Sequence, residues 1–497
     1  MRWRSWLTDP AAWPFDNSFL RELPGLFTPW TAEAPKAPAL VLFNDTLAAC
    51  LGLPGREAGE AQLAAWYSGA GPIPGSEPAA LAYAGHQFGT FNPTMGDGRA
   101  LLLGEIVAPD GTRFDLQFKG SGRTPYSRGG DGMCALGPAL REYLVSEAMA
   151  ALGAPTTRSL AVTTTGSGIW REQPHPAAVL TRVAASHLRI GTFEFAATHQ
   201  GLAAVERLCD YALARHYPAL LSAPNRPLAL LEAVAEAQAR LVAKWMALGF
   251  VHGVMNTDNV TISGETIDYG PCAFLDTYSA NEVFSSIDQH GRYAYGQQPA
   301  VCRWNLYQLA SALIEAIAAA DGADVETARM LLEDWPMRYH THWLREMRAK
   351  LGLGSERDED DALAQELFVL LEGQQADFTM TFRALATSLS QGFDAFAAQL
   401  LEPDRLRPWH AGWVERLALD AADPEATAAV MNAVNPLYIP RNQRLDAALS
   451  AAETGDLVPF NGMLAAVSQP FTAESGWEDY SAIPLSGAPH HVTFCGT

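Results

Sequence analysis

The residues best suited to chemistry lie between Phe250 and Gly270, where Asp258 and Asn259 form one polar turn and Asp268 begins another. Carboxylate and amide oxygens suit Mg²⁺, which takes one or two carboxylates and completes its shell with nucleotide phosphates. An isolated Asp-Asn pair more often only shapes a turn. The second acidic turn at Asp268 favours a metal and nucleotide site.

The same stretch follows most of the protein-kinase signature, in which His-Arg-Asp-x-x-x-x-Asn precedes Asp-Phe-Gly. His252 and Asn259 align with the His and the Asn, and Asp268-Tyr-Gly270 takes the place of Asp-Phe-Gly. Val254 occupies the position of the catalytic aspartate, and a valine cannot accept a proton. Both metal positions are therefore kept, while Asp258 is a new acid beside the Asn.

A helix and a hairpin are the elements expected to position these acids. Apolar residues recur at a helical period through 230–248, and Gly249 suits the end of that helix. The β-branched pieces Val260–Ile262 and Thr266–Ile267 flank Ser263-Gly264, which predicts a two-stranded hairpin. That hairpin would hold the two acidic turns at its ends, facing a common space.

Upstream, two strands are predicted at Ala100–Val107 and Thr112–Lys119, joined by a Pro-Asp-Gly turn. A lone lysine at a strand end is usually solvated. Lys119, however, leads directly into the glycine-rich loop 120–132, and such a loop before a helix is a ready anion site. The earlier Gly96-Asp-Gly98 turn is a weak signal by itself.

A helix predicted at Met133–Leu152 carries Glu142 and Glu147, either of which could pair with the strand lysine as in kinases or lie at the surface. Strands follow at 157–164 and 177–184. Arg182 and Arg189 could clamp phosphates bidentately or form ordinary salt bridges, and the sequence does not choose.

Composition bounds the classes of function. The chain has 497 residues, of which 48% are hydrophobic and 18% charged, as in folded proteins of one to three domains. A net charge of −21 argues against nucleic acid or anionic membrane as a partner. No apolar run approaches the roughly 18 residues of a membrane span, and no signal peptide is evident. The six cysteines show no zinc spacing, so a reduced, cytoplasmic protein is expected.

Together these residues closely resemble the selenoprotein O family. The resemblance covers most of the chain and is densest in eight runs. These are Gly85-His-Gln-Phe-Gly89, Gly96-Asp-Gly-Arg99, Gln117-Phe-Lys119-Gly-Ser-Gly122, Thr124-Pro-Tyr-Ser-Arg128, Arg141-Glu-Tyr-Leu144, Leu180-Thr-Arg-Val183, residues 252–259 and Asp268-Tyr-Gly-Pro271. The resemblance implies an α+β, protein-kinase-like, two-lobed fold that binds ATP in reversed orientation and transfers AMP to Ser, Thr or Tyr hydroxyls of proteins.

Site roles follow from the resemblance alone. Asp258 would be the base, Asn259 and Asp268 would hold Mg²⁺ or Mn²⁺, and Glu142 would be the partner of the lysine. Met133 stands where many members have Arg, which puts one contact of the loop in doubt. The positions implied to contact the nucleotide are Gly96, Gly98, Arg99, Lys119, Asp131, Gly132, Arg182, Arg189 and Asp268.

The resemblance also suggests a domain plan and a redox element. Residues 1–80 would form an N-terminal arm, 81–195 the N-lobe, 196–345 the C-lobe with the catalytic loop, and 346–497 a C-terminal helical extension with a redox tail. The family carries a selenocysteine or cysteine near its C-terminus, here Cys495, and a disulfide between it and Cys272 would tie the tail across the site.

Two other functions fit part of the pattern. An ordinary ATP-dependent phosphotransferase needs a base near the γ-phosphate, and Val254 speaks against it. A non-catalytic pseudokinase would bind ATP without releasing pyrophosphate, and it has no need of Asn259 and Asp268 in register.

Overall fold

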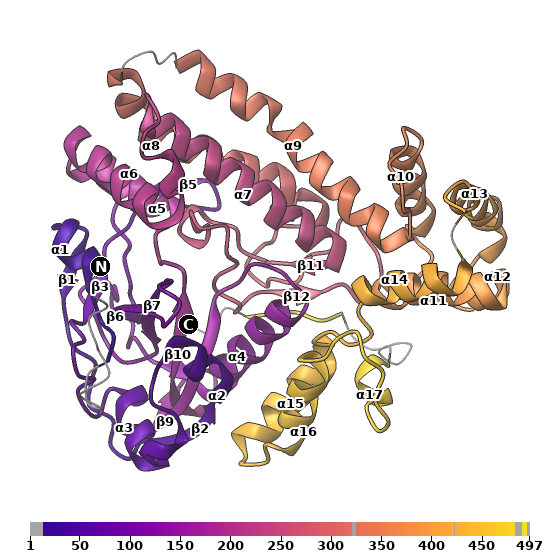
Figure 1. Ribbon diagram of the computed structural model, residues 1–497. Coiled ribbons are helices and arrows are strands. Elements are labelled where there is room, and N and C mark those ends of the chain that lie inside the picture. The colour runs from indigo at the N-terminus through magenta and orange to yellow at the C-terminus, as the bar shows by residue number, and fades with distance from the viewer. Residues whose placement is uncertain (1–12, 321–324, 422, 483–489, 495–497) are drawn as a thin grey trace.

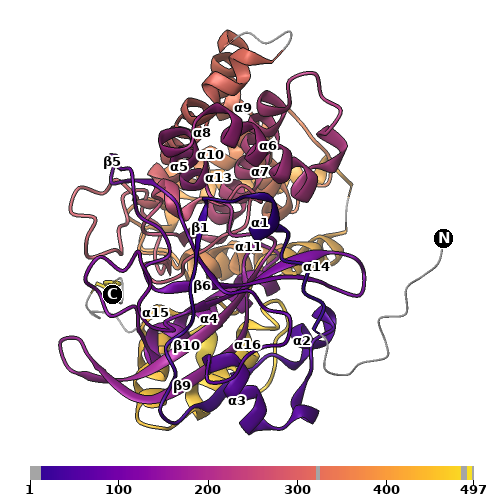
Figure 2. The ribbon, with the colours of Figure 1, turned by 90° about the vertical axis from the view of Figure 1, so that its left-hand side faces the viewer.

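The structure is a computed structural model that describes residues 13–320, 325–421, 423–482 and 490–494. A large sheet occupies the N-terminal part of the chain, and helices dominate from residue 190 onward (Figure 1). In Figure 2, helices α5 (Ile190–His199), α6 (Leu202–His216), α7, α8 and α9 lie in the upper part of the molecule, and α2 and α3 lie in the lower part beside strands β9 and β10. The expectation of an α+β protein is confirmed.

The large sheet is antiparallel, and β7 lies near its centre. Its side chains alternate: Leu116 and Phe118 pack with α2 (Asp45–Leu51) and α3 (Glu60–Ser68), so Lys119 faces the opposite side. The strands in spatial order are β1 Phe27–Pro29, β3 Ala79–Leu81, β6 Ala100–Val107, β7 Arg113–Lys119, β10 Pro174–Ala184, β9 Arg158–Trp170 and β2 Ala39–Phe43, with β8 Cys134–Ala135 against β10.

Helix α4 (Leu136–Ala151) covers the face of the sheet to which Lys119 points, and its Leu140 and Leu144 are fully buried there. The helix begins three residues later than the sequence predicted. Cys134 and Ala135 extend the sheet because they pair with Ala178 and Ala177 of β10, which helical periodicity could not reveal.

Helix α7 (Arg226–Leu248) confirms the predicted helix, and Gly249 ends it with a φ of 70°. It packs on α8 (Gln298–Ala319) and α9 (Val325–Leu351), which gives the loop after it a rigid base. The predicted hairpin after that loop is wrong. Thr261 instead forms a β-bridge with Arg189, and Thr266 forms one with Thr156. These partners, which are distant in the sequence, lie alongside the segment that was expected to fold on itself.

The N-terminal segment contains more regular structure than the sequence indicated. The predicted helix at 44–51 is α2, but residues 13–80 also supply α1 (Ser18–Glu22), α3, and the outer strands β1 and β2 of the sheet.

Further helices follow α9. Of these, α15 (Asn442–Glu453) and α16 (Val458–Val467) pack against α4. Within the described ranges no helix combines the length and the apolar run needed to cross a bilayer. The others are α10 Asp360–Leu371, α11 Phe378–Gln391, α12 Phe393–Ala397, α13 Arg407–Ala418, α14 Pro424–Val434 and α17 Glu478–Ser481.

Candidate active site

A pocket of about 570 Å³ opens between the sheet and the loop after α7. It brings together residues up to 185 positions apart, from Tyr83 to Asp268, which is why neither half of the chain could make it alone. Every residue for which the sequence implied a nucleotide, metal or catalytic contact lines it. These are Gly96, Gly98, Arg99, Lys119, Asp131, Gly132, Arg182, Arg189, Asp258, Asn259 and Asp268.

Four charged side chains meet at the inner end of this pocket. Lys119 Nζ lies 2.5 Å from both Glu142 Oε2 and Asp268 Oδ1, and Arg182 Nη2 lies 2.5 Å from Glu142 Oε1. Glu142 is thus the glutamate that meets the strand lysine, whereas Glu147 pairs with Arg158. Burial alone would raise the pKa of Glu142, but Arg182 and Lys119 hold it below its usual value.

Asp268 has a backbone conformation that is rare for its residue type, with φ at 66°. Its carboxylate is one-fifth exposed and faces the pocket. Burial opposes its charge, yet Lys119, Arg99 and Arg182 together hold its pKa well below the ordinary range. Asp268 is therefore a permanent anion that is held towards the cations, and such strain is typical of functional positions.

Asp258 differs from Asp268 in its surroundings. It sits in the short 3₁₀ turn η3 (Thr257–Asn259), is 8% exposed, and burial raises its pKa to about 6. Arg189 donates from Nη1 to the backbone oxygen of Asp258 at 3.1 Å and lies over the ring of Tyr83 at 4.5 Å. Among the described residues Asp258 Oδ1 has no hydrogen-bond partner. It is a buried acceptor without a proton donor.

A contact within the same loop fixes the orientation of the Asn259 side chain. Asn259 donates from its amide nitrogen to Val254 O at 3.0 Å, so its oxygen is the atom left for a ligand. His252 contacts Ile267 O through Nε2 at 2.8 Å and thereby joins the two acidic turns. A site built from Asn259 Oδ1 and Asp268 fits Mg²⁺, because that ion needs few protein oxygens when phosphates supply the rest. In the described part of the chain no three His, Cys, Asp or Glu residues cluster as a metal cage.

The glycine-rich segments form the rim of the pocket. Gly96 has φ at 86° and lies so close to Tyr126 that a Cβ would stand 2.3 Å from its ring. A Cβ on Gly132, where φ is 68°, would stand 2.0 Å from the backbone oxygen of Gly122. These glycines therefore let two loops touch, which keeps the rim narrow.

Asp131 does not point freely to the nucleotide space. It forms two contacts with Arg171, at 2.7 and 3.0 Å, and this pairing holds its pKa below the usual value. Met133 lines the pocket next to it and pairs with Ser121. The sequence did not single out Arg171, because no pattern near the end of β9 marks this residue as functional.

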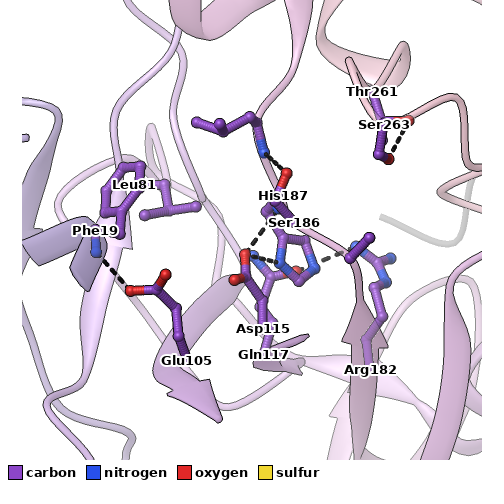
Figure 3. A network of polar contacts seen from close by, with 12 residues as sticks. Phe19, Leu81, Glu105, Asp115, Gln117, Arg182, Ser186, His187, Thr261 and Ser263 are labelled. Carbon is purple, nitrogen blue, oxygen red and sulfur yellow. Dashed lines mark hydrogen bonds and ion pairs between the residues drawn. The ribbon is translucent and has the colours of Figure 1, made fainter. Parts of the chain in front are cut away.

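Two buried polar residues of β7, Asp115 and Gln117, contact residues beside and in the pocket. Asp115 accepts hydrogen bonds from the backbone N–H and the ring Nδ1 of His187, at 2.8 and 3.0 Å (Figure 3). Gln117 Oε1 accepts from Arg182 Nη1 at 3.2 Å. Every second residue of β7 from Asp115 to Lys119 thus carries a polar contact, and Arg182 is held on two sides.

Asp97 and Tyr83 are further pocket residues that the sequence reasoning did not assign. Asp97 Oδ2 accepts from the backbone N–H of Leu81 and from Gln117, and Asp97 Oδ1 lies 3.6 Å from Arg189 Nη2. The signal that could have found Asp97 is its place between Gly96 and Gly98. Tyr83 carried no such signal.

Cys272 lies behind the Asp268 turn, buried, and its pKa is raised to about 12 mainly by that burial. Thr493 approaches the same place: its Oγ1 donates to Pro271 O at 2.7 Å, and it bridges to Ser285. Cys495 lies outside the described residues.

Comparison with known proteins decides the family. The model of the family described as protein adenylyltransferase SelO matches residues 14–468. The chain belongs to the SelO family. The resemblance seen in the sequence is therefore confirmed, as is the expectation of a nucleotidyltransferase family.

Three bacterial SelO relatives, each named protein nucleotidyltransferase YdiU, align along nearly the whole chain. The protein of Sphingopyxis alaskensis is 54% identical over 483 residues, which cover 97% of this chain and 99% of the relative. That of Cereibacter sphaeroides is 51% identical over 486 residues, with coverage of 97% and 99%. That of Rhizobium rhizogenes is 49% identical over 488 residues and covers 97% of each chain.

Proposed function

We propose that the chain transfers AMP from ATP to Ser, Thr or Tyr hydroxyls of proteins. The observation that carries this proposal is the buried Oδ1 of Asp258, which has no hydrogen-bond partner among the described residues, in the same pocket as a cluster of cations, while Val254 stands at the kinase base position. A pKa near 6 suits a general base at neutral pH.

We also propose a kinase-like, two-lobed organisation. Residues 1–80 would be the arm, 81–195 the N-lobe, 196–345 the C-lobe, and 346–497 the extension with its tail. The ion pair between Lys119 on β7 and Glu142 on α4 supports this, because kinases pair a strand lysine with a helix glutamate in the same way.

ATP would bind in reversed orientation. Lys119 and Arg182 are buried at the inner end of the pocket, so they would draw the terminal phosphates inward. The loop around Arg128 and Gly130 is exposed at the rim, where the nucleoside would lie. The α-phosphorus is then the phosphorus nearest to the acceptor and to Asp258.

The transfer step balances with these residues. The acceptor hydroxyl gives its proton to Asp258 while its oxygen bonds to the α-phosphorus. The bond from that phosphorus to the bridging oxygen breaks, and pyrophosphate leaves with the electron pair. Lys119, Arg182 and Arg189 would offset the charge of the phosphates. Asn259 and Asp268 would hold Mg²⁺ or Mn²⁺, which supplies further positive charge when bound.

Labelled ATP tests the proposal. The wild-type chain should transfer label from α-labelled ATP, and not from γ-labelled ATP, to a preparation of total cell protein. Asp268→Ala and Lys119→Ala should lower that transfer at least 100-fold, because each removes charge that the transition state needs. Label from the γ-position would instead indicate a phosphotransferase, and ATP binding without any transfer would indicate a pseudokinase.

Finally, we propose that the protein works in the cytoplasm and that Cys272 and Cys495 form a disulfide under oxidising conditions. The described cysteines are thiols, as expected of a reducing compartment. The contact of Thr493 with Pro271 brings the tail beside Cys272.

A further inference from the structure

Thr257, the residue before Asp258, joins three elements of the fold. Its hydroxyl donates to Glu194 Oε2 at 2.7 Å and accepts from the backbone N–H of His86 at 2.7 Å. Glu194 Oε1 lies 2.5 Å from His86 Nδ1, which closes a triangle of contacts. Glu194 belongs to α5 (Ile190–His199) and His86 to β4 (Gly85–Gln87), and neither residue lines the nucleotide pocket.

We propose that Glu194 is a positioning residue for the transfer reaction: by holding Thr257, it fixes Asp258 at the acceptor end of the pocket. The inference rests on the proposed function, since it gives Glu194 a role relative to the proposed base.

The direction of the Asp258 carboxylate depends on the backbone of its turn and on packing, because among the described residues its Oδ1 accepts no hydrogen bond. Gly85 packs so tightly that a Cβ there would stand 2.9 Å from this oxygen. The hydroxyl of Thr257 is the neighbouring side-chain group that anchors the turn, and both of its hydrogen-bonding functions are used.

Helix α5 contacts the turn that carries Asp258 at two points. Arg189 at its N-cap contacts the backbone oxygen of Asp258, and Glu194, five residues later, contacts Thr257. Burying a carboxylate costs free energy unless it is well paired, and burial raises the pKa of Glu194. One of its oxygens accepts from Thr257 in the turn that carries Asp258, and the other contacts His86, so this buried carboxylate ties the turn to β4.

Loss of this anchor should affect the maximal rate and leave ATP binding unchanged. Glu194→Ala should lower the maximal rate of label transfer from α-labelled ATP about 10- to 100-fold, the usual effect of removing an orienting partner. The ATP concentration for half-maximal rate should stay within about 3-fold. Glu194→Gln should restore most of the rate, since its amide can still accept from Thr257 and donate to His86.

A second pair of variants keeps the test decisive if Glu194→Ala does not fold. Thr257→Val removes the hydroxyl at equal volume and should reproduce the loss of rate, whereas Thr257→Ser keeps the hydroxyl and should retain the rate. An unchanged rate in Glu194→Ala or Thr257→Val, or an equal weakening of ATP binding, would overturn the role of Glu194. Absence of AMP transfer by the wild-type chain would instead overturn the proposed function.

Discussion

At the scale of single residues, the inner end of the pocket is a balanced group of two cations and two anions. Lys119 and Arg182 face Glu142 and Asp268 at hydrogen-bonding distances, and three of the four are nearly fully buried. A buried ion pair adds little net stability while it is intact, but removing one partner leaves a costly unpaired charge. The group therefore sets the positions of Lys119 and Arg182, the cations proposed to bind phosphate, more than it stabilises the fold.

Glu142→Gln tests the cost of leaving one of these charges unpaired. The substitution leaves an excess positive charge beside Lys119 and should lower the free energy of unfolding by about 3 kcal/mol. It should also lower the rate of AMP transfer at least 10-fold. Denaturant unfolding and label transfer would measure both effects.

Glu147→Gln is the matched control on the same helix. Its partner Arg158 is more than one-third exposed, so this variant should lose less stability and keep its activity. Equal losses of activity in both variants would contradict the assigned role of Glu142.

Helical periodicity could not choose between these two glutamates, and only the family resemblance implied Glu142. Both lie on α4, and helical periodicity alone left either able to meet Lys119. The distinction comes from β9, whose first residue, Arg158, captures Glu147. By contrast, the pairing of the two acidic turns was visible because their residue types and order match a known nucleotide-binding pattern.

At the scale of elements, local signals predicted local structure well. Helix α7 with Gly249 and the strands β6 and β7 follow from periodicity and turn residues. The failures occurred where a segment pairs with a distant one. Thr261 and Thr266 bond to Arg189 and Thr156 rather than to each other, and β8 takes the place of the first turn of α4.

The junction of α9 and α11 contains a buried lysine whose protonation should affect stability. Lys350 is 4% exposed, with its Nζ 3.9 Å from the centre of the Phe382 ring. Burial, with a smaller contribution from Lys244, lowers its pKa to about 7, although Glu346 acts in the opposite direction. The unfolded chain holds the proton up to about pH 10, so the destabilisation is complete below pH 7 and disappears as the pH rises towards 10.

Lys350→Met should therefore be more stable than the wild type by about 2–4 kcal/mol at pH 7, with a difference that shrinks towards pH 10. Denaturant unfolding at several pH values would measure it. Lys244→Met, at a partly exposed site, removes only the smaller contribution to that pKa and should show a weaker trend of the same sign. A difference that is constant with pH would mean that the aromatic ring keeps Lys350 charged.

At the scale of the whole molecule, the first and last segments that the structure describes lie on the body that carries the pocket. The N-terminal strands widen the sheet, and residues 490–494 lie along the 284–286 segment behind the Asp268 turn. Only the family resemblance implied that the tail lies near this turn, because single contacts such as that of Thr493 with Pro271 leave no mark in composition or periodicity.

The proposed disulfide between Cys272 and Cys495 would be the covalent form of that arrangement. Mass mapping of the oxidised protein should find a linked peptide that contains both residues, and Cys495→Ser should lose it. Cys50→Ser should keep it, because Cys50 is exposed on α2, a helix that packs on the other face of the sheet. An oxidised sample without the linked peptide would refute the pairing.

The packing of α15 against α4 bears on the order of synthesis. Glu453 accepts from the backbone N–H of Gly137 at 3.0 Å and contacts His175 at 3.0 Å, so it anchors the start of the helix that carries Glu142. A ribosome makes this anchor more than 300 residues after the helix that needs it. The helix that carries Glu142 therefore reaches its full set of contacts only after residue 453 has been synthesised.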